Sequence, residues 1–256
     1  MDLDADHLTL GLATTEEDRL AAERLRYEVF IQELGGDGDM TDHDGRFERD
    51  HFDPDFDHLI LVDGNRNRST LDHVIGVYRL LPGGRRDRFY SEDEYDISVL
   101  VESGRKLLEL GRSCVRQGYR GGIALHLLWT GLADYVRERD IEILFGVASF
   151  HGKDIDALAE PLSHLHHSYL APPQLRVRAR EEVYQPMDLL APEGIDRVAA
   201  MRATPALIKS YLKLGGFVGD GAFVDQKFNT TDVCLVIDID LMKPAARVRY
   251  SKGYGA

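Results

Sequence analysis

Cysteine is scarce in this sequence, and its scarcity excludes several classes of protein. Only two cysteines, Cys114 and Cys234, occur among 256 residues, and neither belongs to a CxxC pair. Two isolated thiols give no disulfide framework and too few ligands for a structural zinc site. Both lie in apolar runs, so we expect both to be thiols of the protein core.

Long apolar runs are also missing. No stretch approaches the roughly 18 uninterrupted apolar residues that a membrane span requires. The start, MDLDADHLTL, has neither the basic region nor the apolar centre of a secretory signal. We therefore expect a cytoplasmic protein. Hydrophobic residues still make up 43% of the chain, which is enough for it to bury a core of its own.

Positive charge is in deficit. The chain has 31 lysines and arginines against 44 aspartates and glutamates, a formal net charge of −13. A general nucleic-acid or anionic-membrane binder would be expected to carry a broad basic face, so the composition predicts no nucleic-acid partner. Basic residues gather only locally, as at Arg85, Arg86 and Arg88, where a solvated surface and a local docking site are both compatible with the sequence.

The hydrophobic pattern changes between helix and strand periods, which indicates a single α/β domain over residues 1–256 with a mixed sheet. Capping-box spacing at Thr14 and Glu17 predicts the start of a first long helix. An acidic segment near 35–57 follows that helix. It lacks periodicity, and we predict that it forms a long irregular loop.

The middle of the chain predicts a βαβ unit. After strands at 58–62 and 74–81, the run KLLELGRSCVRQ at 106–117 suits a central strand whose polar side chains face a cleft. A glycine-rich turn, a helix at 123–139 and a buried strand at 141–149 follow. In such units, ligands bind near the carboxyl end of the first strand.

The remaining sequence predicts an insertion and a second α/β alternation. Near 151–203 we expect an inserted helix, bent at Pro161, and an exposed connection bounded by prolines. A helix at 205–214 and strands at 221–224 and 232–239 are then expected.

Several enzyme motifs are missing. The chain has no dinucleotide fingerprint, no P-loop and no GxSxG nucleophile elbow. His151 and Asp156 have the spacing of glycerolipid acyltransferases, but a two-residue pattern arises easily by chance. On a helix, side chains diverge by about 100° per residue, so His164, His166 and His167 do not converge on one point. We predict no metal site.

The turn QGYRGG, residues 117–122, lies between a predicted strand and a predicted helix. Backbone N–H groups at the start of a helix suit a phosphate, and Arg116 and Arg120 add positive charge. Glycine turns between strand and helix also occur without any ligand. Both interpretations therefore stay open at this stage.

Charged residues stand inside segments that otherwise look buried: Arg79 in VIGVYRLL, and Glu109 with Arg112 in LELGRSCV. A buried charge is costly unless it is paired, so these residues either compensate one another or serve a ligand. Glu109 and Arg112 would lie on opposite faces of a regular strand unless a bulge intervenes. A bulge would leave backbone N–H groups to hold a thioester carbonyl as its charge grows.

Seven segments occur in a characteristic order: LRYEVFIQELGG, FERDHFDPDFDHLILVD, VIGVYRLLPGG, FYSEDEYDIS, LELGRSCVRQGYRGGIALHLLWTGLADYV, LFGVASFHG and PALIKSYLKLGGFV. Together they resemble the ornithine N-acyltransferases of ornithine-lipid synthesis, a hemolysin-like GNAT family. A more distant similarity extends to the acyl-homoserine-lactone synthases. The resemblance runs from about residue 25 to residue 238. It implies a GNAT-like (acyl-CoA N-acyltransferase) fold, with a mixed central β-sheet flanked by helices.

The resemblance also implies roles for particular residues. The implied substrate-binding residues are Arg26, Phe30, Glu48, Asp50, Asp53 and Arg79. The implied catalytic residues are Glu109 and Arg112, an E-x-x-R pair. The residues implied to bind the carrier's pantetheine are Arg116, Tyr119, Arg120, Gly121 and Gly122. This turn matches the usual GNAT pyrophosphate loop only in part, which favours carrier-bound pantetheine, with its single phosphate, over coenzyme A.

The reaction implied by the resemblance transfers a 3-hydroxy fatty acyl group from acyl carrier protein to the α-amine of L-ornithine, giving lyso-ornithine lipid. The partners are then acyl carrier protein and a small amino acid acceptor. The phosphopantetheine thioester is the donor substrate, and no separate cofactor is needed. The chain is expected in the cytoplasm, with peripheral contact at the inner membrane left open.

Aminolysis of a thioester gives each charged group a task. Glu109 is the expected base, acting directly or through water. Arg79 or Arg112 is expected to hold the acceptor carboxylate, and Asp50 or Asp53 a distal ammonium.

Two alternatives remain open. One is an N-acyl amino acid or acyl-homoserine-lactone type of synthase that uses another acceptor. The other is a GNAT-like domain that binds a thioester or a protein without turnover. The acidic loop favours a cationic acceptor, and the E-x-x-R strand favours turnover.

Overall fold

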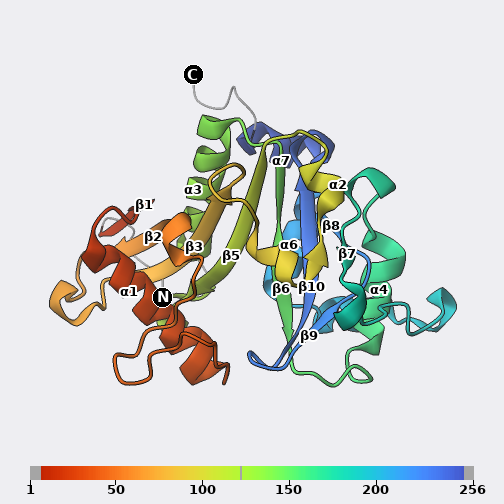
Figure 1. Cartoon of the computed structure of the whole chain (residues 1–256), viewed down its shortest axis with the longest axis horizontal. Coiled ribbons are helices and arrows are strands. Elements are labelled where there is room, and N and C mark those ends of the chain that lie inside the picture. Colours follow the sequence, from red (N-terminus) through yellow and green to blue (C-terminus); the bar gives the residue numbers. More distant parts are fainter. Residues whose placement is uncertain (1–6, 122, 251–256) are drawn as a thin grey trace. The chain divides into compact units, whose positions relative to one another are not determined.

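The computed structural model describes residues 7–121 and 123–250 (Figure 1). The chain forms two compact units. The first comprises the described residues of Met1–Arg85 and Leu110–Arg139, and the second those of Arg86–Glu109 and Asp140–Ala256. The boundary falls inside strand β5 (Leu107–Val115), whose residues through Glu109 belong to the second unit and whose remainder belongs to the first.

The strands of the first unit are β1 (Leu8–Leu12), β2 (Asp57–Asp63), β3 (Val74–Pro82) and the later part of β5. Strand β2 pairs antiparallel with both β1 and β3, and β3 neighbours β5. The predicted strands at 58–62 and 74–81 are confirmed to within a residue. Strand β1 was not predicted, because its five residues are only half-buried and follow an acidic start.

The first helix begins one residue later than its prediction, and its helical run ends at Glu33, just before the acidic segment predicted near 35–57. Helix α1 (Glu16–Arg26) is capped by Thr15, whose hydroxyl accepts from the Asp18 N–H, so the capping residue predicted at Thr14 was wrong by one position. Beyond Arg26 the chain continues as a π-helix, η1 (Tyr27–Glu33), before Gly35 adopts φ 74°. Sequence patterns did not signal this π-helix, because such segments are rare and occur mostly as short insertions within α-helices.

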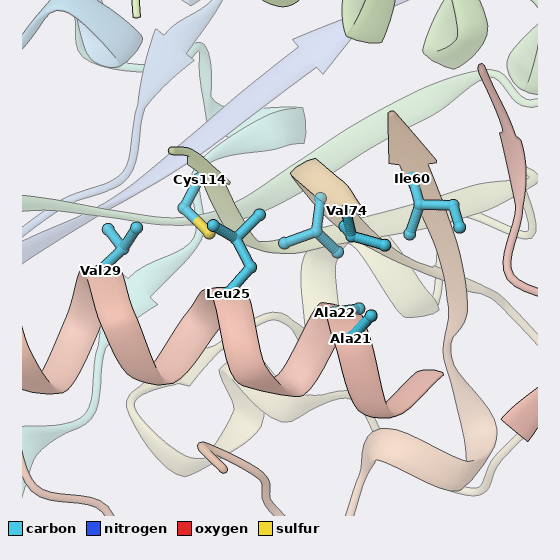
Figure 2. Close-up of a cluster of buried hydrophobic side chains, with 8 residues drawn as sticks. Ala21, Ala22, Leu25, Val29, Ile60, Val74 and Cys114 are labelled. Carbon is cyan, nitrogen blue, oxygen red and sulfur yellow. The ribbon is translucent and has the colours of Figure 1, made fainter. Parts of the chain in front are cut away.

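Helices cover the strands of the first unit from both sides. Figure 2 shows side chains of α1 and η1 packed against Ile60, Val74 and Cys114. The neighbours of Ile60 along β2 point the other way, since strand side chains alternate, and they approach α3 (Ile123–Arg139). At Gly131 of α3 a Cβ would stand 2.6 Å from a Leu10 methyl, so only glycine allows this approach of helix to sheet.

The acidic segment before β2 contains little regular structure. Asp42 and Phe47 form an isolated antiparallel bridge, and a 3-10 turn, η2 (Asp53–Asp55), precedes β2. Phe52 and Glu48 are fully buried, with exposed fractions of 0% and 1%. The segment is therefore anchored to the unit through these two side chains.

Strands β6 (Ile143–His151) and β10 (Thr230–Asp238) form the centre of the second unit. They pair antiparallel along their whole lengths, and the first residues of β5 run parallel to β6. Strands β8 (Phe217–Val218) and β9 (Phe223–Asp225) also pair with β10. A small separate sheet joins β4 (Tyr95–Asp96) and β7 (Arg178–Ala179). Helices of this unit include α2 (Ser98–Val101), α4 (Ala159–Tyr169), α5 (Arg197–Ala203), α6 (Ala206–Leu214) and α7 (Pro244–Tyr250).

Two expectations for the second unit were wrong. Helix α4 begins only at Ala159, so Pro161 lies in its first turn, where a missing N–H costs little, and does not bend it. The connection after α4 is not simply exposed, because Leu175, Val177 and Ala179 are buried and β7 pairs with β4. No helix in the described part of the chain has the length and apolarity needed to cross a bilayer.

Candidate active site

Three arginines and three carboxylates of the first unit form one ion-pair network. The arginines come from α1, β3 and β5, and the carboxylates come from the acidic segment before β2. The members are Arg26, Glu48, Asp50, Asp53, Arg79 and Arg112. All six are residues that the family resemblance implies, and the fold brings them together.

Asp53 is the centre of this network. Both of its oxygens accept from the Arg26 guanidinium, with 3.0 Å from Nη2 to Oδ2, and Oδ1 also accepts from Arg79 Nη1 at 2.9 Å. The backbone N–H of Asp50 donates to Oδ2 at 2.7 Å. These four donors engage both oxygens of the carboxylate, which leaves Asp53 little capacity for a further cation.

Glu48 and Asp50 connect the network to Arg112. Glu48 accepts from Arg26 Nε at 2.5 Å and from Arg112 Nε at 3.0 Å. Asp50 accepts from Arg79 Nη1 at 2.8 Å and lies 3.6 Å from Arg112 Nη2. The side chains of Asp50 and Arg112 are 16% and 15% exposed, whereas those of Arg26 and Arg79 are at most 1% exposed. Asp50 and Arg112 thus form the most exposed edge of the network.

Mutual compensation keeps these buried groups ionised. Burial alone would raise the pKa of Asp53, but Arg26 and Arg79 outweigh it and hold that pKa well below its usual range. Burial would likewise lower the pKa of Arg26, yet Asp53 and Glu48 raise it. With three charges of each sign, the network is neutral as a whole.

His58 adjoins the network and was missed by sequence reasoning. Its Nε2 lies 3.4 Å from the Asp53 carbonyl oxygen and 3.5 Å from Asp53 Oδ1. Burial and the nearby Arg26 lower the pKa of His58 to about 4, so the ring is neutral near pH 7. The available signal for His58 was its position at the start of the otherwise apolar run of β2.

Glu109 belongs to the second unit, and its contacts there are with the turn η4 (Tyr90–Asp93). Its carboxylate accepts from the backbone N–H groups of Tyr90 and Ser91, at 2.8 and 2.6 Å, and from the Ser91 hydroxyl. The side chain is 1% exposed. Three donors therefore fix the orientation of this carboxylate. Sequence reasoning did not identify Ser91, which lies 18 residues away along the chain.

The strand is irregular between the two predicted catalytic residues. Arg112 has φ 48°, in the left-handed region that non-glycine residues seldom adopt. The regular alternation of side chains is interrupted there, as a bulge between Glu109 and Arg112 would require. Strain of this kind at a polar residue is typical of functional sites.

Phe30, the remaining predicted substrate-binding residue, is half-buried in η1 and packs against the hydrophobic cluster of α1. Its placement beside the core supports a packing role as readily as a ligand contact.

The predicted phosphate-binding turn joins β5 to α3 in the first unit, and its charged side chains already have partners. Arg116 pairs with Glu28 at 2.5 Å and Arg120 pairs with Glu33 at 2.5 Å. The Tyr119 hydroxyl donates to the Asp63 carboxylate, which raises the pKa of Tyr119 in addition to the effect of its burial. Sequence reasoning missed the three acidic partners. The backbone of the turn is only partly described: Gly121 has φ 74°, and Gly122 lies outside the described residues.

Other chemistries find no support among the described residues. These contain no group of three or more His, Cys, Asp or Glu side chains that could hold a metal ion. Both cysteines are buried, as expected. Burial raises the pKa of Cys114 to about 12, which leaves almost no thiolate for nucleophilic attack near pH 7.

Comparison with known proteins gives concordant results. Residues 25–130 match the acetyltransferase (GNAT) domain family. Over 95% of the chain, and 94% of the relative, the sequence is 54% identical to an L-ornithine N(alpha)-acyltransferase from Rhodobacter capsulatus. This identity confirms the family resemblance found in the sequence.

Two solved structures share the fold. One is FeeM, an N-acyl amino acid synthase from uncultured soil microbes, at 12% identity and a TM-score of 0.53, covering 94% of this chain and 97% of the other. The other is BjaI, a CoA-dependent acyl-homoserine lactone synthase, at 13% identity and a TM-score of 0.51, covering 94% and 89%. The predicted GNAT-like α/β fold is confirmed.

Proposed function

Because the chain belongs to the family of L-ornithine N(alpha)-acyltransferases, we propose that it acylates the α-amine of L-ornithine with a 3-hydroxy fatty acyl group. The chain is an acyltransferase, and the proposal adds its substrates. The donor is the thioester of acyl carrier protein, and the products are lyso-ornithine lipid and the free carrier thiol. A lipid product also suggests peripheral contact with the inner membrane. The identity of 54% over nearly the whole chain carries this proposal.

The proposed reaction is direct aminolysis. The α-ammonium loses a proton, its nitrogen forms a bond to the thioester carbon, the carbon–sulfur bond breaks, and the thiolate takes up a proton. Glu109 is the proposed base, acting directly or through water. Its support is a carboxylate whose direction is fixed by Tyr90 and Ser91. Because thiolate is a good leaving group, orientation and charge stabilisation suffice.

The irregular backbone at Arg112 is the proposed place for the thioester carbonyl. As the amine attacks, negative charge grows on the carbonyl oxygen, and nearby backbone N–H groups stabilise it. The support is the φ of 48° at Arg112, which turns the backbone out of regular strand geometry.

Acceptor recognition is proposed at the open edge of the ion-pair network. Arg112 is proposed to bind the ornithine carboxylate and Asp50 its δ-ammonium, since these are the most exposed members of their charge types there. Asp53 is less suited to this role because two arginines already engage its carboxylate. Arg26 and Glu48 are buried behind this edge, and Glu48 holds Arg112 in place by accepting from its Nε.

Mass spectrometry of lipids from a heterologous host expressing this chain tests the proposal. The expected result is a new lyso-ornithine lipid carrying a 3-hydroxy acyl chain. Purified protein should form the same product from L-ornithine and 3-hydroxyacyl carrier, and little from norvaline. An acylated amino acid other than ornithine would overturn the proposed acceptor. Product formed from 3-hydroxyacyl-coenzyme A but not from the acyl carrier would overturn the proposed donor.

A further inference from the structure

The turn between β5 and α3 offers little uncompensated positive charge from its arginines. Both guanidinium groups are paired with glutamates of η1, Arg116 with Glu28 and Arg120 with Glu33. A phosphate that reaches the turn therefore meets arginines that already hold an anion. The two pairs differ in how easily they exchange it.

The Arg116 pair is the more enclosed. Its side chains are 15% and 21% exposed, and Arg116 also donates to the Val74 carbonyl. The Arg120 pair is 43% and 30% exposed. Arg120 Nε donates to the Val115 carbonyl at 2.8 Å, which holds the guanidinium at the end of β5 whatever its Nη2 binds. Arg120 can therefore exchange one anion for another without leaving its place.

The helix that contains Glu33 does not itself stabilise the Glu33 carboxylate. Glu33 is the last residue of η1, where the helix dipole places partial negative charge and an acidic side chain is unfavourable. The last turn of η1 carries no basic residue. The carboxylate is thus held mainly by Arg120, across 87 residues of sequence.

We propose that Glu33 is a built-in competitor for the donor's phosphate at Arg120. This inference rests on the proposed function, and it concerns the phosphate ester of pantetheine, whether carried by a protein or by coenzyme A. When the donor binds, Arg120 Nη2 passes from the Glu33 carboxylate to the phosphate. When the spent donor leaves, Glu33 takes its place again. Glu33 therefore weakens donor binding and assists release of the free thiol.

Tyr119 has the opposite effect in the same turn. Its hydroxyl donates to Asp63, at the end of β2, and Asp63 also accepts from the backbone N–H of Asn65. The Tyr119 hydroxyl is neutral and brings no positive charge to a phosphate, so its bond to Asp63 matters mainly for the position of the turn. Tyr119 is therefore a positioning residue that holds the turn against β2.

Steady-state kinetics of Glu33→Gln with three donors tests the proposal. The donors are a 3-hydroxyacyl carrier, the corresponding acyl-coenzyme A, and acyl-pantetheine, which has no phosphate. For any phosphate-bearing donor that is used, KM should fall about two- to fivefold, the range expected for an exposed ion pair. The KM for acyl-pantetheine should not change. Tyr119→Phe should instead raise KM for the phosphate-bearing donors.

The matched control is Glu16→Gln, since Glu16 is also an exposed glutamate of this helical run and pairs with an arginine, Arg19, at 2.5 Å. It should leave all donors unchanged. In Arg120→Ala, adding Glu33→Gln should have no further effect. An equal fall in KM for acyl-pantetheine, or no fall for any donor, would overturn the proposal.

Failure of the proposed function gives a different result. If the unaltered protein acylates no ornithine with any donor, calorimetric binding of coenzyme A and of pantetheine replaces the kinetics. Tighter binding of coenzyme A alone by Glu33→Gln would then support the inference independently, and unchanged binding would overturn it.

Discussion

The ion-pair network around Asp53 and the turn between β5 and α3 both contain arginine–carboxylate pairs, but the pairs differ in burial. In the network, Arg26 and Arg79 are at most 1% exposed and share one carboxylate. In the turn, Arg120 is 43% exposed and has a single carboxylate partner. Removing one partner leaves a buried charge uncompensated in the first case, whereas water replaces the partner in the second. The network is therefore suited to hold a shape, and the turn is where we propose that one anion replaces another.

The largest effect is expected from Arg26→Leu. It leaves Glu48 and Asp53 without their main partner in a buried site, which should lower the free energy of unfolding by about 3–5 kcal/mol. Chemical denaturation measures the loss. Arg19→Leu, which breaks an exposed pair, should cost at most about 0.5 kcal/mol. Equal losses in the two variants would remove the contrast between buried and exposed pairs.

Acidification should weaken the network through His58. Its pKa is about 4 in the folded protein against 6.5 ordinarily, so the unfolded chain binds the proton more readily. Stability is complete above pH 6.5 and falls as the pH drops towards 4, by about 3 kcal/mol. The network arginines also lower the pKa values of the buried carboxylates, so the loss of stability from these groups begins at lower pH, where the carboxyls of the unfolded chain take up protons.

Unfolding in urea at several pH values checks this dependence. His58→Gln should flatten the stability profile between pH 6.5 and 4. His43→Gln is the comparison, since His43 is 56% exposed, and it should leave the slope unchanged. If the slope persists in His58→Gln, another group is responsible for it.

Glu109→Gln tests the proposed base. The substitution keeps the shape but removes the proton acceptor, so kcat should fall at least about a hundredfold, with a smaller change in the KM for the acceptor. Glu181→Gln, at an 87% exposed position, is the control and should retain full turnover. A raised KM at unchanged kcat would assign Glu109 to binding.

The roles of Asp50 and Asp53 can be distinguished by comparing two acyl acceptors, ornithine and norvaline. Asp50→Asn should reduce kcat/KM for ornithine about tenfold and for norvaline much less, because only ornithine loses a charge-assisted hydrogen bond. Asp53→Asn should instead lower thermal stability and leave the ratio of the two acceptors unchanged. Measurements at fixed salt and saturating donor decide between the two, and a parallel loss for both acceptors in Asp50→Asn would contradict its proposed role.

The smallest effect is expected in the turn. Arg120→Ala should raise the KM for the carrier-bound donor about two- to fivefold and flatten its salt dependence, since an exposed charge is removed. Arg202→Ala, on α5, is the control and should have no effect. Unchanged donor kinetics in Arg120→Ala would separate the turn from phosphate binding.

Local patterns were enough to predict the longer elements. Helix α3 was predicted with its observed bounds, because a glycine break precedes it and basic residues close its last turn. Strand β3 was recognised from a mostly apolar run that Arg79 interrupts. Short elements such as α2 and α5 were missed, since four to seven residues do not establish a period.

The candidate site was predictable in part. Arg79, Glu109 and Arg112 were visible as charges inside apolar strands, and family resemblance supplied Arg26 and Asp53. Their partners were not visible, because nothing local links Arg116 to Glu28, 88 residues away. A hydrogen bond between residues that are distant along the chain produces no local sequence pattern from which it could be predicted.

The π-helix that continues α1 changes the angular phase of its side chains. Residues five apart, such as Glu28 and Glu33, would point about 140° apart around an α-helix. A helix with i to i+5 bonding has a wider turn and brings them closer to the same side. The wider turn thus favours placing the two glutamates on one side of the helix, and one of them pairs with Arg116 and the other with Arg120. A single-residue deletion in η1 that restored the α-helix would leave one arginine of the turn without its glutamate.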